Sequence, residues 1–288
     1  MRSLSLSVWL MLLFLLLRAS SPAAAQRAPV VKVAGSSGKT TCSLNIQGNS
    51  AGDGIKSASL ICTGSGTVTV AVHQQLQDVL VHKGVKTVSG EKSCELQGDP
   101  CLLLLCGSDA EFIRPVINGV QSVDGIWGVL CFDMGSKITL RKGQFTSCGM
   151  PIVGIFDYQA SALVDQCTFQ GNSGDRHGAG PVFDGATLLV KSSTFKGNVA
   201  VVANDNNGGA MYLIHGSTTI VDSIFHSNEA TNGGALFLAG SATVSIQGSQ
   251  FVRNTAGSFG AAIYAWDEAK VDILPVPKQA PGMWVWSW

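Results

Sequence analysis

The amino-acid sequence predicts an all-β fold, a parallel β-helix in which one chain winds into a stack of similar coils. Three observations predict it: a phenylalanine recurs at a nearly constant interval, a strand pattern precedes each copy, and no helical period appears between the copies. The repeated residues are Phe145, Phe169, Phe195, Phe225 and Phe251, at spacings of 24, 26, 30 and 26 residues. Like residues of successive coils stack about 4.8 Å apart in such a fold, so the rings should form an internal ladder.

An apolar column and a mostly polar column precede the phenylalanines. The column five residues before each ring contains Leu140, Val164, Val190, Ile220 and Ile246. The column four residues before each ring contains Arg141, Asp165, Lys191, Val221 and Gln247. Alternation with a period of two is typical of a strand that buries one face. Each coil should therefore carry a strand just before its phenylalanine.

Small and turn-forming residues occupy the remaining columns. Two residues before each ring stand Gly143, Cys167, Ser193, Ser223 and Ser249, and three residues after it stand Cys148, Asn172, Asn198, Asn228 and Asn254. Asparagine tolerates left-handed backbone conformations in turns, and stacked amides can also bond to each other along the coils. Two later turns begin with glycine pairs, Gly208 with Gly209 and Gly233 with Gly234, each followed by alanine and an apolar strand.

Other repeat architectures fit the spacing less well. Leucine-rich repeats share the period but need leucine at fixed offsets, and a propeller blade needs about 40 residues. We therefore predict that residues 101–270 form a single-stranded β-solenoid.

The repeated motifs also carry a resemblance. F-x-x-N occurs four times and is joined to G-G-A-apolar. This pairing resembles the polymorphic outer membrane protein repeats of chlamydial surface proteins, which also occur in secreted right-handed β-helix proteins. The resemblance implies a right-handed, pectin-lyase-like β-helix. In the chlamydial family these repeats form an exposed region implicated in adhesion, so it also implies an adhesive role outside the cell.

Residues 1–25 have the pattern of a secretory signal peptide. Arg2 precedes an apolar run from Leu4 to Leu17, and Ala23 to Ala25 supply the small residues that signal peptidase needs. The run is shorter than the roughly 20 apolar residues that span a bilayer, so an uncleaved anchor is the weaker alternative. We expect a secreted, extracellular or cell-surface protein with no transmembrane segment after signal cleavage.

All eight cysteines follow the expected cleavage site. They are Cys42, Cys62, Cys94, Cys101, Cys106, Cys131, Cys148 and Cys167. An even count in a secreted chain favours disulfides, whose pairing the spacing does not determine. A zinc site would need closely paired ligands such as C-x2-C, and the nearest spacing is C-x4-C from Cys101 to Cys106. We expect no metal and no cofactor.

The two ends of the chain differ from the repeats. Residues 26–100 are irregular and contain cysteines, and we predict a cap or early coils pinned by disulfides, because a terminal coil exposes unpaired backbone. A separate small disulfide-rich domain is the alternative. Residues 271–288 are rich in proline and end with three alternating tryptophans at 284, 286 and 288. This tail either caps the last coil or marks a sequence that continues in the natural protein.

The motifs of pectin-type hydrolases are missing. Those enzymes resemble one another in an Asp-Asp pair, G-H-G and R-x-K, and this chain has none of these. Paired carboxylates are needed because one acts as the acid while the other activates water. Asp175, Arg176 and His177 form the densest polar triplet, but adjacent residues of an extended segment point to opposite faces, which favours a loop. The segment 204–206 is interpreted as a solvated turn.

The isolated acids and histidines predict no site by themselves. Asp157, Asp165, Asp184, Asp205 and Asp222 occupy different repeat offsets, so they predict no acidic ladder for calcium. His215 and His226 are eleven residues apart and are expected at solvated positions. No catalytic residue and no binding residue can therefore be assigned from the sequence.

Charge and composition limit the function. The chain has 19 basic and 19 acidic residues, 13% charged residues in all, and no basic run, which excludes nucleic-acid binding through a basic surface. The favoured hypothesis is a non-catalytic β-helix protein that binds extracellular polysaccharide, matrix, wall or surface proteins along its flank. The alternative is a diverged polysaccharide lyase or hydrolase. Converging carboxylates in a groove, rather than a smooth flank, would favour the enzyme.

Overall fold

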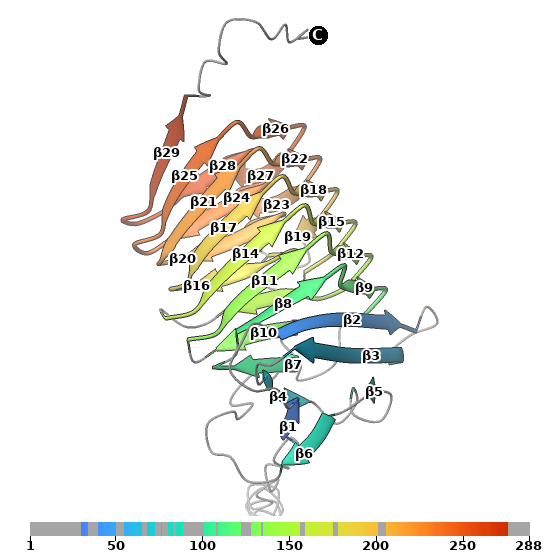
Figure 1. The fold of residues 1–288 in the computed structure, drawn as a ribbon. Helices are drawn as coiled ribbons and strands as arrows, with labels where there is room; N and C mark the ends of the chain where they lie inside the picture. The colour runs from blue at the N-terminus through green and yellow to red at the C-terminus, as the bar shows by residue number, and fades with distance from the viewer. Residues whose placement is uncertain are drawn as a thin grey trace, which may run out of the picture.

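A computed structural model of the 288-residue chain shows a stack of β-coils, which confirms the predicted fold class (Figure 1). The structure describes residues 30–33, 40–49, 55–64, 68–72, 76, 80–82, 85–88, 101–107, 109–121, 128–133, 135–155, 159–174, 178–200 and 206–275. The predicted signal peptide and most of the predicted Pro/Trp-rich tail lie outside these residues. No helix in the described part of the chain combines the length and apolar character that crossing a membrane requires.

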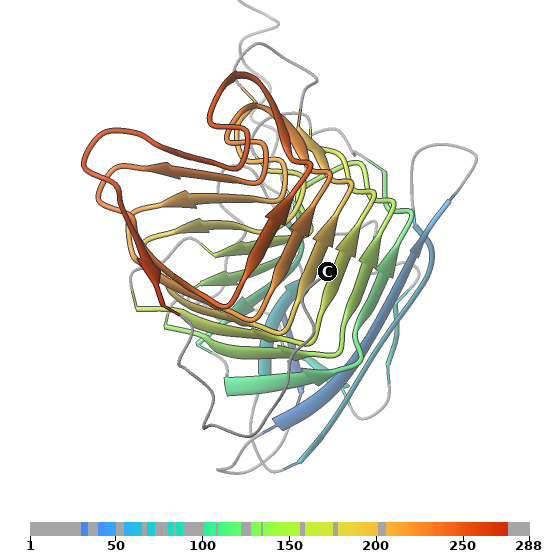
Figure 2. The same ribbon diagram turned by 90° about the horizontal axis from the view of Figure 1, so that it is seen from above.

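Three sheets run along the stack, and Figure 2 shows the coils from above. The first sheet has one strand from every coil, and its neighbours from β7 onward are parallel. These strands are β7 (Cys101–Cys106), β10 (Gly128–Asp133), β13 (Val153–Ile155), β16 (Val182–Asp184), β20 (Met211–Ile214), β24 (Leu236–Ala239) and β28 (Ile263–Ala265).

The second sheet has two arms, one for each of two further strands per coil. The first arm contains β8 (Asp109–Ile113), β11 (Lys137–Arg141), β14 (Ser161–Asp165), β17 (Thr187–Lys191), β21 (Ser217–Val221), β25 (Thr243–Gln247) and β29 (Lys270–Leu274). The second arm contains β9 (Val116–Asn118), β12 (Gln144–Thr146), β15 (Thr168–Gln170), β18 (Thr194–Lys196), β22 (Ile224–His226) and β26 (Gln250–Val252). A short third sheet joins β19 (Val199–Ala200), β23 (Glu229–Asn232) and β27 (Thr255–Phe259).

Strands with both parallel and antiparallel pairing cover the N-terminal end of the stack. The long strand β2 (Thr40–Gly48) runs parallel to both β8 and β9 and so joins the two arms, and β3 (Ile55–Gly64) pairs antiparallel on its outer side. On the first sheet, β4 (Val68–Val72) pairs antiparallel with β7. The remaining strands of this end are β1 (Val30–Val33), β5 (Leu80–His82) and β6 (Val85–Val88).

The repeated phenylalanines form one stack inside the coils. Successive rings from Phe145 to Phe251 lie 4.6, 4.8, 4.7 and 4.6 Å apart between centroids. The strands of the second arm hold this spacing, because each phenylalanine is in register with the next. Phe145, Phe169, Phe195 and Phe225 are fully buried. In the first coil Ile117 takes the place of the ring.

The asparagines form a second ladder, at the turn after the second arm. The side chain of Asn198 donates from Nδ2 to the Oδ1 of Asn228 at 2.9 Å and to the backbone oxygen of Phe169 at 3.0 Å. Its own Oδ1 accepts from the backbone and side-chain nitrogens of Asn172, at 3.2 and 2.9 Å. The same contacts recur between Asn228 and Asn254. The buried turn backbone is therefore satisfied by the side chain of the next coil.

The glycine pairs sit where the backbones of adjacent coils touch. Gly208 and Gly233 have φ values of +72° and +63°, which residues with a side chain rarely adopt. A Cβ on Gly209 would lie 2.3 Å from the carbonyl oxygen of Gly234, and a Cβ on Gly234 would lie 2.2 Å from that of Ala261. Only glycine fits at these turns.

The cysteines are paired only in part, which corrects the expectation of disulfides throughout. Disulfides join Cys42 to Cys62 across β2 and β3, and Cys101 to Cys131 across β7 and β10. Cys148 and Cys167 are buried free thiols. The physical reason is their position: Cys148 begins the asparagine ladder and Cys167 begins the serine ladder, and each backbone nitrogen donates to the next ladder member. Cys94 and the side chain of Cys106 lie outside the described part of the chain.

Candidate functional site

The outward face of the first arm is the strongest candidate for a binding site. Its strands are in register, so outward side chains form three rows that run along the stack. From β8 to β17 the first row is Asp109, Lys137, Ser161 and Thr187; the second is Glu111, Thr139, Leu163 and Leu189; the third is Ile113, Arg141, Asp165 and Lys191. The inward positions between them, such as Leu140 and Val164, fill the core.

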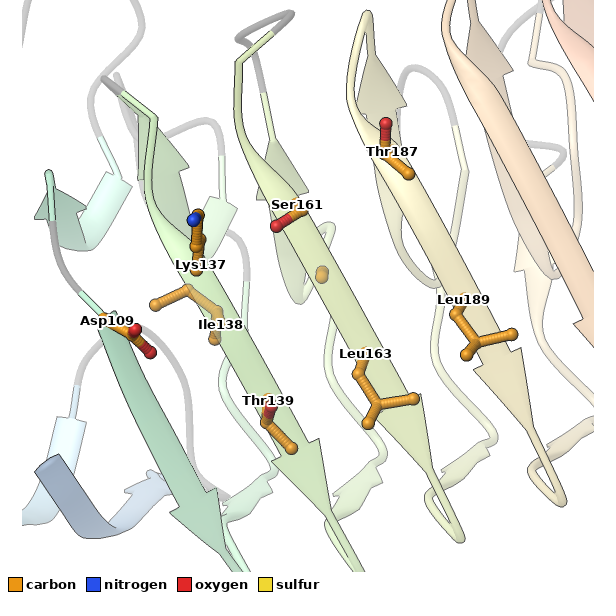
Figure 3. A pocket seen from close by; sticks show the side chains of 9 residues that line it. Asp109, Lys137, Ile138, Thr139, Ser161, Leu163, Thr187 and Leu189 are labelled. Carbon is orange, nitrogen blue, oxygen red and sulfur yellow. The ribbon is translucent and has the colours of Figure 1, made fainter. Parts of the chain in front are cut away.

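A shallow groove of about 420 Å³ follows the first two rows across these four strands (Figure 3). It is lined by Asp109, Lys137, Ile138, Thr139, Ser161, Ala162, Leu163, Thr187 and Leu189. Hydroxyl groups, one lysine and one carboxylate thus alternate with two leucine side chains along a surface that spans four coils. This mixture suits a long ligand that has both hydroxyl groups and apolar C–H surfaces.

A charged cluster borders the groove. The Nε of Arg141 on β11 donates to Glu111 Oε1 on β8 at 2.9 Å, and Arg141 also forms an ion pair with Asp165 on β14. The Asp165 side chain is only 9% exposed, and its Oδ1 has no hydrogen-bond partner. The bond to Glu111, with the nearby charge of Asp165, raises the pKa of Arg141 above its ordinary value. The guanidinium of Arg141 therefore lies between two carboxylates, and the three side chains come from three successive coils.

Exposed cations surround this cluster. Lys137 lies in the groove, Lys191 follows Asp165 in the third row, and Arg114 and Lys142 occupy neighbouring turns at the end of β8 and β11. None of the four forms an ion pair with another described residue. The charge-poor chain thus gathers cations on this part of its surface, where they can meet an anionic ligand.

The sequence did not single out this site, although one signal was present. Arg141, Asp165 and Lys191 are consecutive members of the polar column, so stacking already predicts that they are neighbours. Glu111 and Lys137 lie outside that column. Glu111 belongs to the coil in which Ile117 replaces the repeated phenylalanine, so the phenylalanine period does not reach it.

The other titratable residues do not converge on the groove. His215 Nδ1 lies 2.8 Å from Asp184 Oδ1 on the first sheet, and both side chains are more than a third exposed. Asp222 lies at a turn with φ +48°, and His226 belongs to the second arm. Several of the predicted positions lie outside the described residues: Asp157, the triplet 175–177, and residues 204 and 205 of the expected solvated turn. The third residue of that turn, Asn206, is buried.

The free thiols are unsuited to nucleophilic chemistry. Burial raises the pKa of Cys148 and that of Cys167 to about 11, so both are protonated at neutral pH. The part of the chain that the structure describes also contains no group of three or more histidine, cysteine or acidic side chains placed to hold a metal ion.

The comparison with protein families decides the classification. A family model described as right handed beta helix region matches residues 108–274, more than half of the chain. The chain belongs to the right-handed β-helix family. The matched region includes all four strands of the groove and the charged cluster. No curated protein and no solved structure matches the sequence.

Proposed function

We propose that this right-handed β-helix protein is secreted or displayed at a cell surface, where it binds an acidic polysaccharide without catalysis and so mediates adhesion. The single observation that carries the proposal is the groove across β8, β11, β14 and β17, with its hydroxyl groups and Lys137, which forms no ion pair with another described residue. The disulfides Cys42–Cys62 and Cys101–Cys131 support an oxidising compartment, because disulfides rarely persist in the cytosol.

The chemistry of the rows favours a polysaccharide chain over a compact ligand. Successive coils repeat the same outward positions at the strand spacing, so an extended chain can meet like groups at a regular interval. Ser161 and Thr187 can exchange hydrogen bonds with sugar hydroxyls, and Leu163 and Leu189 offer apolar contact to the faces of sugar rings. Lys137 and Lys191 can pair with carboxylate or sulfate groups.

A binding titration with defined glycans tests the proposal. We expect isothermal titration calorimetry to show that polyuronate or sulfated polysaccharide binds the full-length protein. Neutral glucan should bind more weakly. The double variant K137A/K191A should raise Kd by about tenfold, because each exposed ion contact is worth up to about 1 kcal/mol. Added salt should weaken binding of the unmodified protein.

The matched control replaces two exposed lysines elsewhere, K56A/K196A, and should keep the original Kd. Equal loss of affinity in the control variant would indicate a general charge effect and contradict a site in the groove. Failure of every polysaccharide to bind the folded protein would contradict the proposal and leave a protein partner for this flank.

One observation favours a second candidate, a diverged polysaccharide lyase or hydrolase. Glu111 and Asp165 lie on either side of Arg141 at the border of the groove. Two carboxylates and a guanidinium are therefore close to a polysaccharide bound in the groove. Both carboxylates already pair with Arg141, and Asp165 is buried. Neither is therefore as available as the acid or base of a hydrolase must be, and the binding function is preferred.

A further inference from the structure

The last described coil exposes residues that are buried in every coil before it. Ile273 on β29 is 77% exposed, whereas its in-register neighbour Ile246 on β25 is 3% exposed. Phe251 is half-buried, although Phe225 directly beneath it is fully buried. Among the described residues, nothing covers the core of the solenoid at this end.

At the opposite end of the stack, described strands cover the second sheet. There β2 runs parallel to β8 and β9, and β3 pairs antiparallel with β2. At the C-terminal end, β26, β27, β28 and β29 each have a described strand on one side only (Figure 1). An uncovered strand edge offers unpaired backbone groups for pairing with another chain.

The backbone of β29 shows how a partner strand can pair there. The Lys270 nitrogen donates to the Ala242 oxygen of the previous coil at 2.8 Å. Backbone groups alternate direction along a strand, so the N–H and C=O groups of Val271 and Ile273 face the open edge. An antiparallel partner can therefore form a hydrogen-bonded pair at Val271.

The charges of β29 favour one arrangement of two identical strands. Lys270 and Asp272 are both exposed and lie on the outward face. If two copies of β29 pair antiparallel about Val271, Lys270 lies opposite Asp272 of the partner subunit, and this opposite-charge pair occurs twice. Pairing centred on Asp272 would place two carboxylates opposite each other, and pairing centred on Lys270 would oppose two ammonium groups. Opposite charges across strands stabilise pairing, and like charges destabilise it.

We propose that the open end is a homodimer interface, in which β29 pairs antiparallel with β29 of a second copy about Val271. A twofold axis normal to the sheet keeps the outward face outward in both copies, so the exposed core residues of the two coils face each other. The interface is isologous and closes at two subunits. It uses a different part of the chain from the groove, so its failure and that of the proposed function can be told apart.

Analytical ultracentrifugation of the full chain over a concentration series tests this interface. The unmodified protein should show a monomer–dimer equilibrium. The variant D272K places lysine opposite lysine twice and should raise the dimer Kd by about tenfold. The double variant K270D/D272K exchanges the two charges, restores both opposite-charge pairs and should return Kd towards its original value. E229K, which changes an exposed acid on the third sheet, is the control and should have no effect.

Two results would overturn the proposal. A monomer at all concentrations would mean that the chain following β29 covers the open end itself. A dimer that D272K leaves unchanged, or that K270D/D272K does not restore, would place the contact elsewhere on the molecule. Circular dichroism of each variant shows whether the coils remain folded, which is expected because both side chains are exposed.

Discussion

At the scale of single residues, adjacent coils are joined by side chains that hydrogen-bond to backbone groups in place of a backbone partner. The Asn198 side chain makes four hydrogen bonds with three residues of the two adjacent coils, and the side chain is fully buried. Serines do the same at the preceding bend, where Ser223 Oγ accepts from the backbone nitrogen of Ser193 at 3.2 Å. Such ladders fix the register of neighbouring coils, because a shift of one residue would leave buried polar groups without partners.

Replacing Asn198 with alanine should therefore be costly. It would leave the backbone nitrogen of Asn172 and the carbonyl of Phe169 without their partner and would remove one of the two donors to Asn228 Oδ1, and each unsatisfied buried group costs about 1–3 kcal/mol. We expect N198A to lower the free energy of unfolding in urea by about 3 kcal/mol or more. N254A, in the half-buried last member of the ladder, should lose less because water reaches it. Equal losses would contradict this account of the ladder.

At the scale of elements, each strand of the first arm has two different faces. The inward positions of β11, Ile138 and Leu140, are buried, and its outward positions carry Lys137, Thr139 and Arg141. The same alternation in β8 and β14 brings Glu111 and Asp165 to the two sides of Arg141. The strand that fills the core therefore also builds the border of the groove.

The charged cluster should behave as a unit in mutagenesis. R141A removes the partner of the buried Asp165 carboxylate, and an unpaired buried charge destabilises the folded state. We expect R141A to lower the urea midpoint more than K142A, which removes the adjacent exposed cation. Adding D165N to R141A should recover part of the loss, because a neutral amide is less costly to bury. Identical midpoints for R141A and K142A would show that the ion pair does not stabilise the strands.

At the scale of the whole molecule, the sequence predicts the stack better than the surface. The phenylalanine and asparagine columns predict the β-helix because each such residue needs an identical neighbour one coil away. Cys148 stands in the asparagine column and Cys167 in the serine column, and their free thiols follow from these ladder positions, whereas counting cysteines favours disulfides for them. The groove was not predicted, because it depends on which outward side chains of different coils become neighbours, and Asp109 in the groove belongs to a coil without the phenylalanine.

The proposed function is that the groove holds a polysaccharide chain without cleaving it. The most direct measurement incubates the oxidised, folded protein with a panel of polyuronates and follows both binding and products. The account predicts retention on the polymer together with no unsaturated products and no new reducing ends over time. Steady release of products, lost in an E111Q or D165N variant that still folds and binds, would contradict it and establish the charged cluster as a catalytic site.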